Sequence, residues 1–208
     1  HKIDYSKLDT LNVSRETFLE LDEFKEMILD ENKKINLISQ HTEELARDRH
    51  IIDCAQIVDL IDENYLSCTD LGSGSGLPGL VIAIIKKKQK SKMKFFLYEK
   101  RFKKSNFLKK VINKFELNAE VINQNIFDQK NLCSDLIVAR AFKPLPIILD
   151  LVTTNFDNFK DIILFLGKSG KSSIKQCLEN WNLEFIEKKS LTEKDSILIK
   201  INKISKKR

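Results

Sequence analysis

Four of the chain's six glycines lie within residues 72–79, directly after a short apolar run. Residues 69–79 read TDLGSGSGLPG. Glycine is needed where the backbone takes a positive φ or comes very close to another group. Pro78 suits the first turn of a helix. The pattern therefore predicts a strand, a glycine turn and a helix, and such turns lie at the strand ends where parallel α/β sheets bind ligands.

The rest of the chain alternates in the same way. Apolar periodicity predicts helices over 14–35, 79–88 and 104–117, and a helix that Thr42 caps, with an apolar face that includes Leu45 and Ile52. Strands are predicted over 65–71, 93–99, 119–123, 134–139, 161–167 and 196–202. Alternation of this kind indicates an α/β fold, a mainly parallel sheet with helices on both faces. We expect a helical extension over 1–64, packed on a sheet domain over 65–208 as one compact unit.

Composition narrows the class of partner. The net charge is +6, from 36 Lys and Arg against 30 Asp and Glu. A net positive charge of this size either keeps the protein soluble or favours binding to a polyanionic partner such as nucleic acid. No apolar run approaches the roughly 18 residues of a membrane span. The four scattered cysteines and three histidines favour no metal site and a reducing compartment, so we expect a cytoplasmic monomer.

Several ligands would suit the glycine turn. A phosphate-binding P-loop is excluded, because neither GKS triplet has a glycine five residues before it. A dinucleotide fits the G-x-G-x-x-G spacing, and a purely structural turn stays open. The order Asp70, Gly72, Gly74, Gly76 resembles the motif of Rossmann-like methyltransferases, and we favour S-adenosyl-L-methionine. Asp70 would hold its ammonium group, and Glu99, unless it is only an exposed strand-end acid, would hold the ribose hydroxyls.

A more specific resemblance covers residues 33–170. The run LGSGSGLPGLVIAI is similar to the glycine segment of the RsmG (GidB) family of bacterial 16S rRNA guanine-N7 methyltransferases. KKINLIS, RHIIDC, DLIVARAF and FLGKSG resemble further segments of that family in the same order. The resemblance implies a class I SAM-dependent methyltransferase fold. It also implies transfer of a methyl group to N7 of a guanine in small-subunit ribosomal RNA or a ribosomal particle.

The resemblance also implies the site residues. The expected cofactor-binding residues are Gly72, Gly74, Leu77, Glu99, Asn125, Ile126 and Arg140, and the expected catalytic residues are Arg140, Lys168, His50 and Asn36. Two alternatives stay open: Arg140 pairs with an acid for stability, and His50 is a structural histidine beside Asp53. The acid usual after the third strand is absent, and Asp128 is a candidate to replace it.

Chemistry and charge add expectations for the substrate side. Guanine N7 carries a lone pair and no proton, so its methylation needs no general base. We expect a mostly apolar or amide-lined slot, with Arg140 or Lys168 at its edge. The lysine-rich tracts 86–94 and 100–110 are candidates for phosphate contacts. We expect Phe102 and Phe107 to pack in the core rather than to stack on bases. A methyltransferase with another substrate, or a non-catalytic RNA-binding protein, would share these features.

Overall fold

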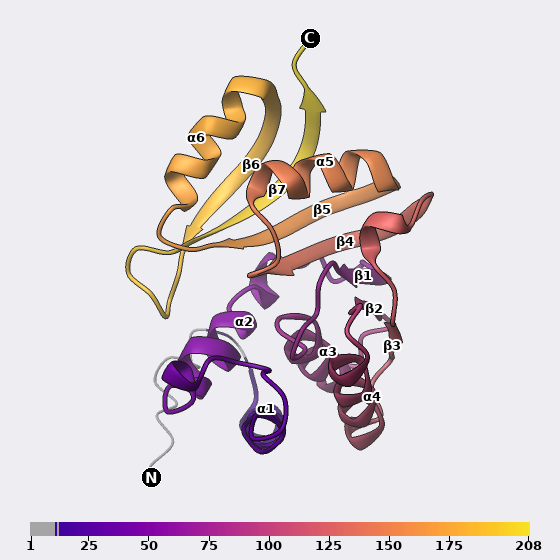
Figure 1. The fold of residues 1–208 in the computed structure, drawn as a ribbon, viewed down its shortest axis with the longest axis vertical. Helices are drawn as coiled ribbons and strands as arrows, with labels where there is room; N and C mark the ends of the chain where they lie inside the picture. The colour runs from indigo at the N-terminus through magenta and orange to yellow at the C-terminus, as the bar shows by residue number, and fades with distance from the viewer. Residues whose placement is uncertain (1–10, 12) are drawn as a thin grey trace.

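The computed structural model describes residue 11 and residues 13–208. This part of the chain contains a seven-stranded sheet in the order β3-β2-β1-β4-β5-β7-β6 (Figure 1). The strands are β1 (Ser67–Asp70), β2 (Lys94–Tyr98), β3 (Ala119–Ile122), β4 (Leu132–Arg140), β5 (Phe156–Leu166), β6 (Trp181–Lys189) and β7 (Ile197–Lys206). Neighbours from β3 to β5 pair in parallel, and β7 runs antiparallel to both β5 and β6. The predicted mainly parallel sheet is confirmed.

Helices cover both faces of the sheet. The longer ones are α1 (Arg15–Asn32), α3 (Gly79–Lys88), α4 (Phe102–Phe115), α5 (Leu145–Asn155) and α6 (Gly170–Asn180). In Figure 1, α5 and α6 lie on one face, and α1, α3 and α4 gather on the other. Each group has its own apolar cluster, and Phe18 of α1 is buried in the same cluster as Ile82 of α3. None of the described helices is both long and apolar enough to cross a bilayer.

Local sequence explains the best-predicted helices. Ser14 caps α1, since its hydroxyl accepts a hydrogen bond from the Thr17 N–H at 3.2 Å. The buried residues of α1 follow a helical spacing and face the core. All residues of α3 from Gly79 to Lys86 are buried. Such a helix needs the continuous apolar run that the sequence supplies.

The helix predicted after Thr42 is broken into short turns. They are η1 (Gln40–Thr42), the π-helical turn η2 (Arg47–Ile52), α2 (Asp53–Ala55) and η3 (Val58–Leu60). Thr42 does not cap a regular helix, and Leu45 is 55 % exposed instead of buried. A π-helical turn carries one extra residue, so it shifts the side chains that follow it around the axis. Polar side chains of η2 thereby reach the sheet edge described below.

Four elements were not among the predicted ones: α5, α6, β6 and the short 3₁₀ helix η4 (Ile126–Asp128). Of the two phenylalanines expected in the core, Phe107 is buried, which confirms that prediction. Phe102 is 68 % exposed, so its expected burial is wrong. It is the first residue of α4, and the first turn of this helix lies outside the apolar cluster.

Candidate functional site

The loops that follow β1, β2 and β4 meet at one edge of the sheet. Asp70, the last residue of β1, pairs in register with Leu97 of β2 and Val138 of β4. Two hollows open at this edge, with volumes of about 510 Å³ and about 360 Å³. We call the larger one the first hollow and the other the second hollow. Ala141, directly after β4, lines both of them.

The first hollow is built on the glycine loop. The Ser73 N–H donates to the Tyr98 carbonyl at 2.8 Å, which ties the loop to the end of β2. Gly74 has φ +58°, a left-handed conformation that suits glycine. Its N–H donates to Glu99 Oε2 at 3.0 Å, and the Arg101 N–H donates to Glu99 Oε1 at 2.8 Å. These bonds fix a carboxylate, only 8 % exposed, in the wall of the hollow.

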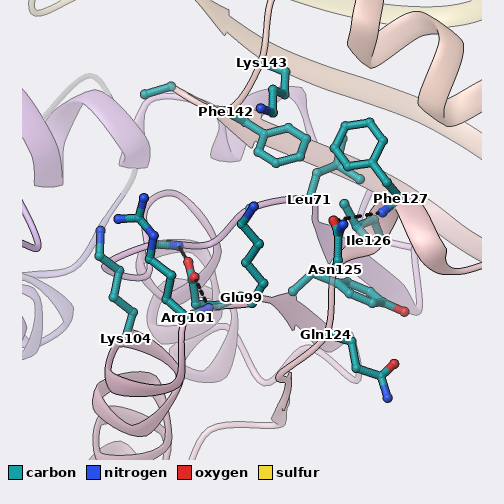
Figure 2. A pocket seen from close by; sticks show the side chains of 15 residues that line it. Leu71, Glu99, Arg101, Lys104, Gln124, Asn125, Ile126, Phe127, Phe142 and Lys143 are labelled. Atoms are coloured by element: carbon teal, nitrogen blue, oxygen red, sulfur yellow. Dashed lines mark hydrogen bonds between the residues drawn. The ribbon is translucent and has the colours of Figure 1, made fainter.

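Five of the seven residues expected to bind cofactor line this hollow: Gly72, Gly74, Glu99, Asn125 and Ile126. Figure 2 shows the Phe127 ring beside the Phe142 ring, with Asn125 and Ile126 next to them. The Phe127 and Phe142 rings stack with centroids 5.9 Å apart, so they form an apolar wall. The Asn125 side chain accepts a hydrogen bond from the Phe127 N–H at 3.3 Å, which leaves its NH₂ group to donate. Asp128 is exposed and does not line the hollow.

Two residues expected at the cofactor lie beneath the loop instead. Asp70 is 0 % exposed, and its Oδ2 accepts hydrogen bonds from Gly79 N–H at 2.9 Å and Ser73 Oγ–H at 3.0 Å. It braces the loop against α3 and does not line the first hollow, and its expected contact with an ammonium group stays a prediction. Burial raises the pKa of Asp70 to about 7, although the hydrogen bonds from Gly79 and Ser73 act to lower it. Leu77 is also buried and lines neither hollow.

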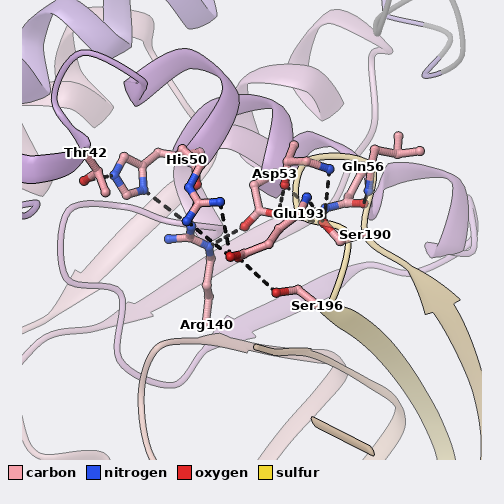
Figure 3. A network of polar contacts seen from close by, with 11 residues as sticks. Thr42, His50, Asp53, Gln56, Arg140, Ser190, Glu193 and Ser196 are labelled. Carbon is pink, nitrogen blue, oxygen red and sulfur yellow. Dashed lines mark hydrogen bonds and ion pairs between the residues drawn. The ribbon is translucent and has the colours of Figure 1, made fainter. Parts of the chain in front are cut away.

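The second hollow is organised around Arg140. Its Nε donates to Asp53 Oδ2 at 2.8 Å, and its Nη2 donates to the Arg49 carbonyl at 2.6 Å (Figure 3). Both side chains are largely buried, with 18 % and 15 % exposure. The alternative role for Arg140, a pair with an acid, is therefore present. Arg140 is placed in the second hollow and not in the first.

His50 lies beside this pair. Its Nε2 is 2.9 Å from Thr42 Oγ1, and its Nδ1 is 3.4 Å from Arg140 Nη2. Burial and, to a smaller extent, the neighbouring Arg140 charge lower the pKa of His50 to about 4. The imidazole is therefore neutral at physiological pH.

A segment between β6 and β7 closes the second hollow. We call residues 190–196 the strap. Thr192 Oγ1 donates to Asp53 Oδ1 at 2.7 Å, and the Leu191 N–H donates to Gln56 Oε1 at 2.9 Å. Glu193 Oε1 lies 3.3 Å from Arg49 Nη1. Within the hollow, the Arg140–Asp53 and Arg49–Glu193 pairs balance charge (Figure 3).

The other two predicted catalytic residues lie outside both hollows. Lys168 is 70 % exposed at the rim of the second hollow, with Nζ 3.9 Å from Glu193 Oε1. Asn36 lines a separate groove together with Arg101 and Lys104. The second hollow matches the expected mostly apolar or amide-lined slot only in part, and its use as the slot for the base stays a prediction. Phe165, Leu166 and Leu198 supply apolar wall, but paired charges supply the rest.

Sequence reasoning missed several lining residues. Phe142 had a local signal, since it ends the ARAF run beside Arg140. Arg49 and Asp53 flank His50 and have the same kind of signal. The strap residues had none, because their contacts with Asp53 and Gln56 span more than 130 positions of the chain.

Comparison with known proteins agrees with this geometry. The family model GidB, rRNA small subunit methyltransferase G, matches residues 18–199. The chain is 50 % identical to the ribosomal RNA small subunit methyltransferase G of Pelagibacter ubique, over 98 % of this chain and 97 % of that protein. It is 32 % identical to the protein of the same name from Ruegeria pomeroyi, over 95 % and 97 % of the two chains.

Solved structures agree at the level of the fold. M. capricolum TrmK in complex with S-adenosyl-homocysteine aligns with TM-score 0.53 and 18 % identity, over 81 % of this chain and 70 % of that one. M. jannaschii TYW2 in complex with AdoMet aligns with TM-score 0.51 and 16 % identity, over 84 % and 80 %. These likenesses show the Rossmann-like methyltransferase fold. The match to the family model and the two relatives show that the chain belongs to the GidB family of ribosomal RNA small subunit methyltransferases G.

Proposed function

We propose that this protein transfers a methyl group from S-adenosyl-L-methionine to N7 of a guanine in 16S ribosomal RNA. One observation carries the proposal: a hollow with a glycine loop and a fixed carboxylate adjoins a charge-balanced hollow, and Ala141 lines both. The names of the relatives support the class of substrate. The neighbouring structures with adenosylhomocysteine and AdoMet support the cofactor.

The residues of the first hollow fit this cofactor. Its volume of about 510 Å³ lies in the range of sites for small molecules and cofactors. Glu99 keeps acceptor capacity for the two ribose hydroxyls after its two backbone bonds. The Asn125 amide and the Phe127–Phe142 wall suit an adenine ring, while Gly72 and Gly74 leave room for the amino acid end. Leu77 supports the loop from beneath.

When bound, adenosylmethionine supplies an electrophilic methyl group on a sulfonium. The chain's own task is then to hold the acceptor base in line with it. Positioning of this kind lowers a barrier by about 7–11 kcal/mol. No proton leaves N7, so the neutral His50 need not act as a base. The residues of the second hollow therefore serve by binding and orienting.

The charge balance of the second hollow suits this reaction. Guanine becomes positively charged as N7 is methylated, so an unpaired cation beside N7 would oppose the reaction. Asp53 offsets the Arg140 charge, and the low pKa of His50 keeps its ring neutral. Arg140 can still donate a hydrogen bond to the guanine O6, a common contact for arginine.

The remaining predicted residues take outer roles in this proposal. Lys168 contacts RNA phosphate at the rim of the second hollow, and Asn36 lies in a groove on the RNA-facing side. Residues 1–64 act as the extension that supplies His50 and Asp53 to the sheet domain over 65–208. We place the reaction in the cytoplasm and the enzyme as a monomer.

Two measurements test the proposal. Calorimetric titration of the purified protein with adenosylhomocysteine should show one site, and absence of heat would remove the cofactor assignment. Incubation with small-subunit RNA or particles from a deletion strain should restore one 7-methylguanosine that the strain lacks. A cofactor-binding protein that leaves this RNA unmodified would be a methyltransferase for another substrate. Tight RNA binding without cofactor affinity would indicate a non-catalytic RNA-binding protein.

A further inference from the structure

The surface at the start of α4 combines an aromatic ring with several cations. Phe102 is 68 % exposed, more than any other large apolar side chain in the described part of the chain. A ring this exposed is not held by the core, since the apolar cluster beneath α4 begins at Phe107. An exposed aromatic ring next to positive charge is typical of surfaces that bind single-stranded nucleic acid.

The cations next to Phe102 in the chain form no ion pairs. Among the described residues, no ion pair involves the side chains of Lys100, Arg101, Lys103 or Lys104. Farther along the same helix the pattern differs, because Lys110 pairs with Glu31 and Lys114 pairs with Glu23. The N-terminal turn of α4 therefore offers positive charge to an external anion.

Two of these cations lie between the first hollow and the separate groove that Asn36 lines. Arg101 and Lys104 line the first hollow, and their side chains extend in the same direction (Figure 2). They also line a groove of about 570 Å³, together with Asn36 and Gln40. Burial and then the Arg101 charge lower the pKa of Lys104, while the Glu99 charge raises it. A phosphate between the two side chains would relieve the repulsion between the Arg101 and Lys104 charges.

We propose that Phe102, Arg101 and Lys104 form a binding platform for a single-stranded RNA nucleotide close to the methylated guanine. The Phe102 ring stacks on its base, and Arg101 and Lys104 bind its phosphates along the groove. The inference rests on the proposed function, because it takes RNA as the substrate. It adds a contact through Phe102, which lines neither hollow and whose removal leaves the core intact.

Affinity for a short guanine-containing single-stranded RNA tests the platform. Phe102→Ala should weaken binding about tenfold, which corresponds to about 1.4 kcal/mol, and Phe102→Tyr should stay within twofold of wild type. Leu66→Ala is the matched control. It removes another exposed apolar side chain, 61 % exposed, just before the start of β1 and thus at the opposite edge of the sheet. It should bind RNA as wild type does, and adenosylhomocysteine affinity should be unchanged in all three variants.

A fluorescence measurement reports stacking directly. The chain has one tryptophan, Trp181, which is buried and common to all variants. Phe102→Trp adds an exposed indole that RNA should quench, whereas Leu66→Trp should give an indole that RNA leaves unquenched. Poly-glutamate should neither quench the indole at position 102 nor displace the RNA. Displacement by poly-glutamate at equal charge would assign the surface to an acidic protein and overturn the RNA platform.

The outcomes separate the platform from the proposed function. Equal RNA affinity of wild type and Phe102→Ala overturns the platform, and a wild type that still methylates this RNA keeps the function. A wild type that binds RNA through Phe102 but methylates nothing keeps the platform and overturns the function. A wild type without RNA affinity overturns both.

Discussion

The two hollows at the sheet edge keep their shape by different means. The first depends on backbone: a glycine loop bonded to Tyr98 and Glu99, all within 30 residues of Asp70. The second depends on side chains from three distant segments, which meet around Asp53. The first is therefore sensitive to any added side chain, while the second is sensitive to the loss of one charge.

The largest effect is expected from a variant that disrupts the backbone of the first hollow. A Cβ atom at Gly72 would overlap the Phe142 ring, so Gly72→Val must displace that ring or the loop. We expect adenosylhomocysteine affinity to fall at least a thousandfold, about 4 kcal/mol, as measured by calorimetry. Affinity within threefold of wild type would contradict this account of the first hollow.

The next largest effect is expected from a variant that removes one charge from the second hollow. Asp53→Asn leaves the guanidinium of Arg140 largely buried without its counter-charge, so the free energy of unfolding should fall by about 3 kcal/mol. Methyl transfer should fall with it, while cofactor affinity changes little. Urea denaturation and a methyl-transfer assay measure the two.

The Asp22–Arg47 pair supplies the control for this variant. Arg47 donates to both oxygens of Asp22, at 2.9 Å and 2.8 Å, away from both hollows. Asp22→Asn should lower stability to a smaller extent, because Arg47 is more exposed than Arg140, and should leave methyl transfer per folded molecule unchanged. If both variants lose transfer equally, the second hollow has no special part in the reaction.

Acid titration should sharpen the comparison. As the pH falls, Asp70 beneath the loop of the first hollow should raise the free energy of unfolding, whereas His50 in the second hollow should lower it. The folded pKa of Asp70, about 7, lies above its unfolded value of 3.8. The folded state therefore takes up a proton first as pH falls, and Asp70 adds about 3 kcal/mol of stability between pH 8 and pH 5. The folded pKa of His50, about 4, lies below 6.5, so His50 removes about 2 kcal/mol over the same range.

Single variants separate these two contributions. Unfolding free energies at pH 8 and pH 5 should show that Asp70→Asn loses the stabilisation by acid. His50→Gln should lose the destabilisation by acid. Parallel pH profiles for wild type and both variants would show that neither group is perturbed by its surroundings.

The smallest effect is expected at Gly74, and it tests whether every glycine of the loop is needed for cofactor binding. A Cβ atom at Gly74 would meet nothing within 4 Å, although its φ of +58° strains any other residue. Gly74→Ala should cost about 1 kcal/mol of stability and weaken cofactor binding less than tenfold. A loss as large as that of Gly72→Val would show that the cofactor itself fills the space at Gly74.

The sequence predicted more of the first hollow, which is built from segments close in the chain, than of the second, which is built from distant ones. The glycine turn, α3 and Glu99 at the end of β2 are set by neighbours in the chain, so periodicity and turn chemistry found them. The strap escaped prediction because its polar residues carry no pattern that points to Asp53. Leu45 was misplaced because it lies in a turn between η1 and η2, where the regular helix that its apolar spacing predicts does not form. Phe102 was misplaced because a helical stripe does not tell where the core ends.

The location of the strap late in the chain has a consequence for synthesis. Every side chain that lines the first hollow has been translated by Lys143, whereas the second hollow needs Ser190, Thr192 and Glu193. The ribosome therefore releases all the residues that line the first hollow well before it releases the last ones of the second. A nascent chain cannot complete the second hollow until β6 and the strap have emerged.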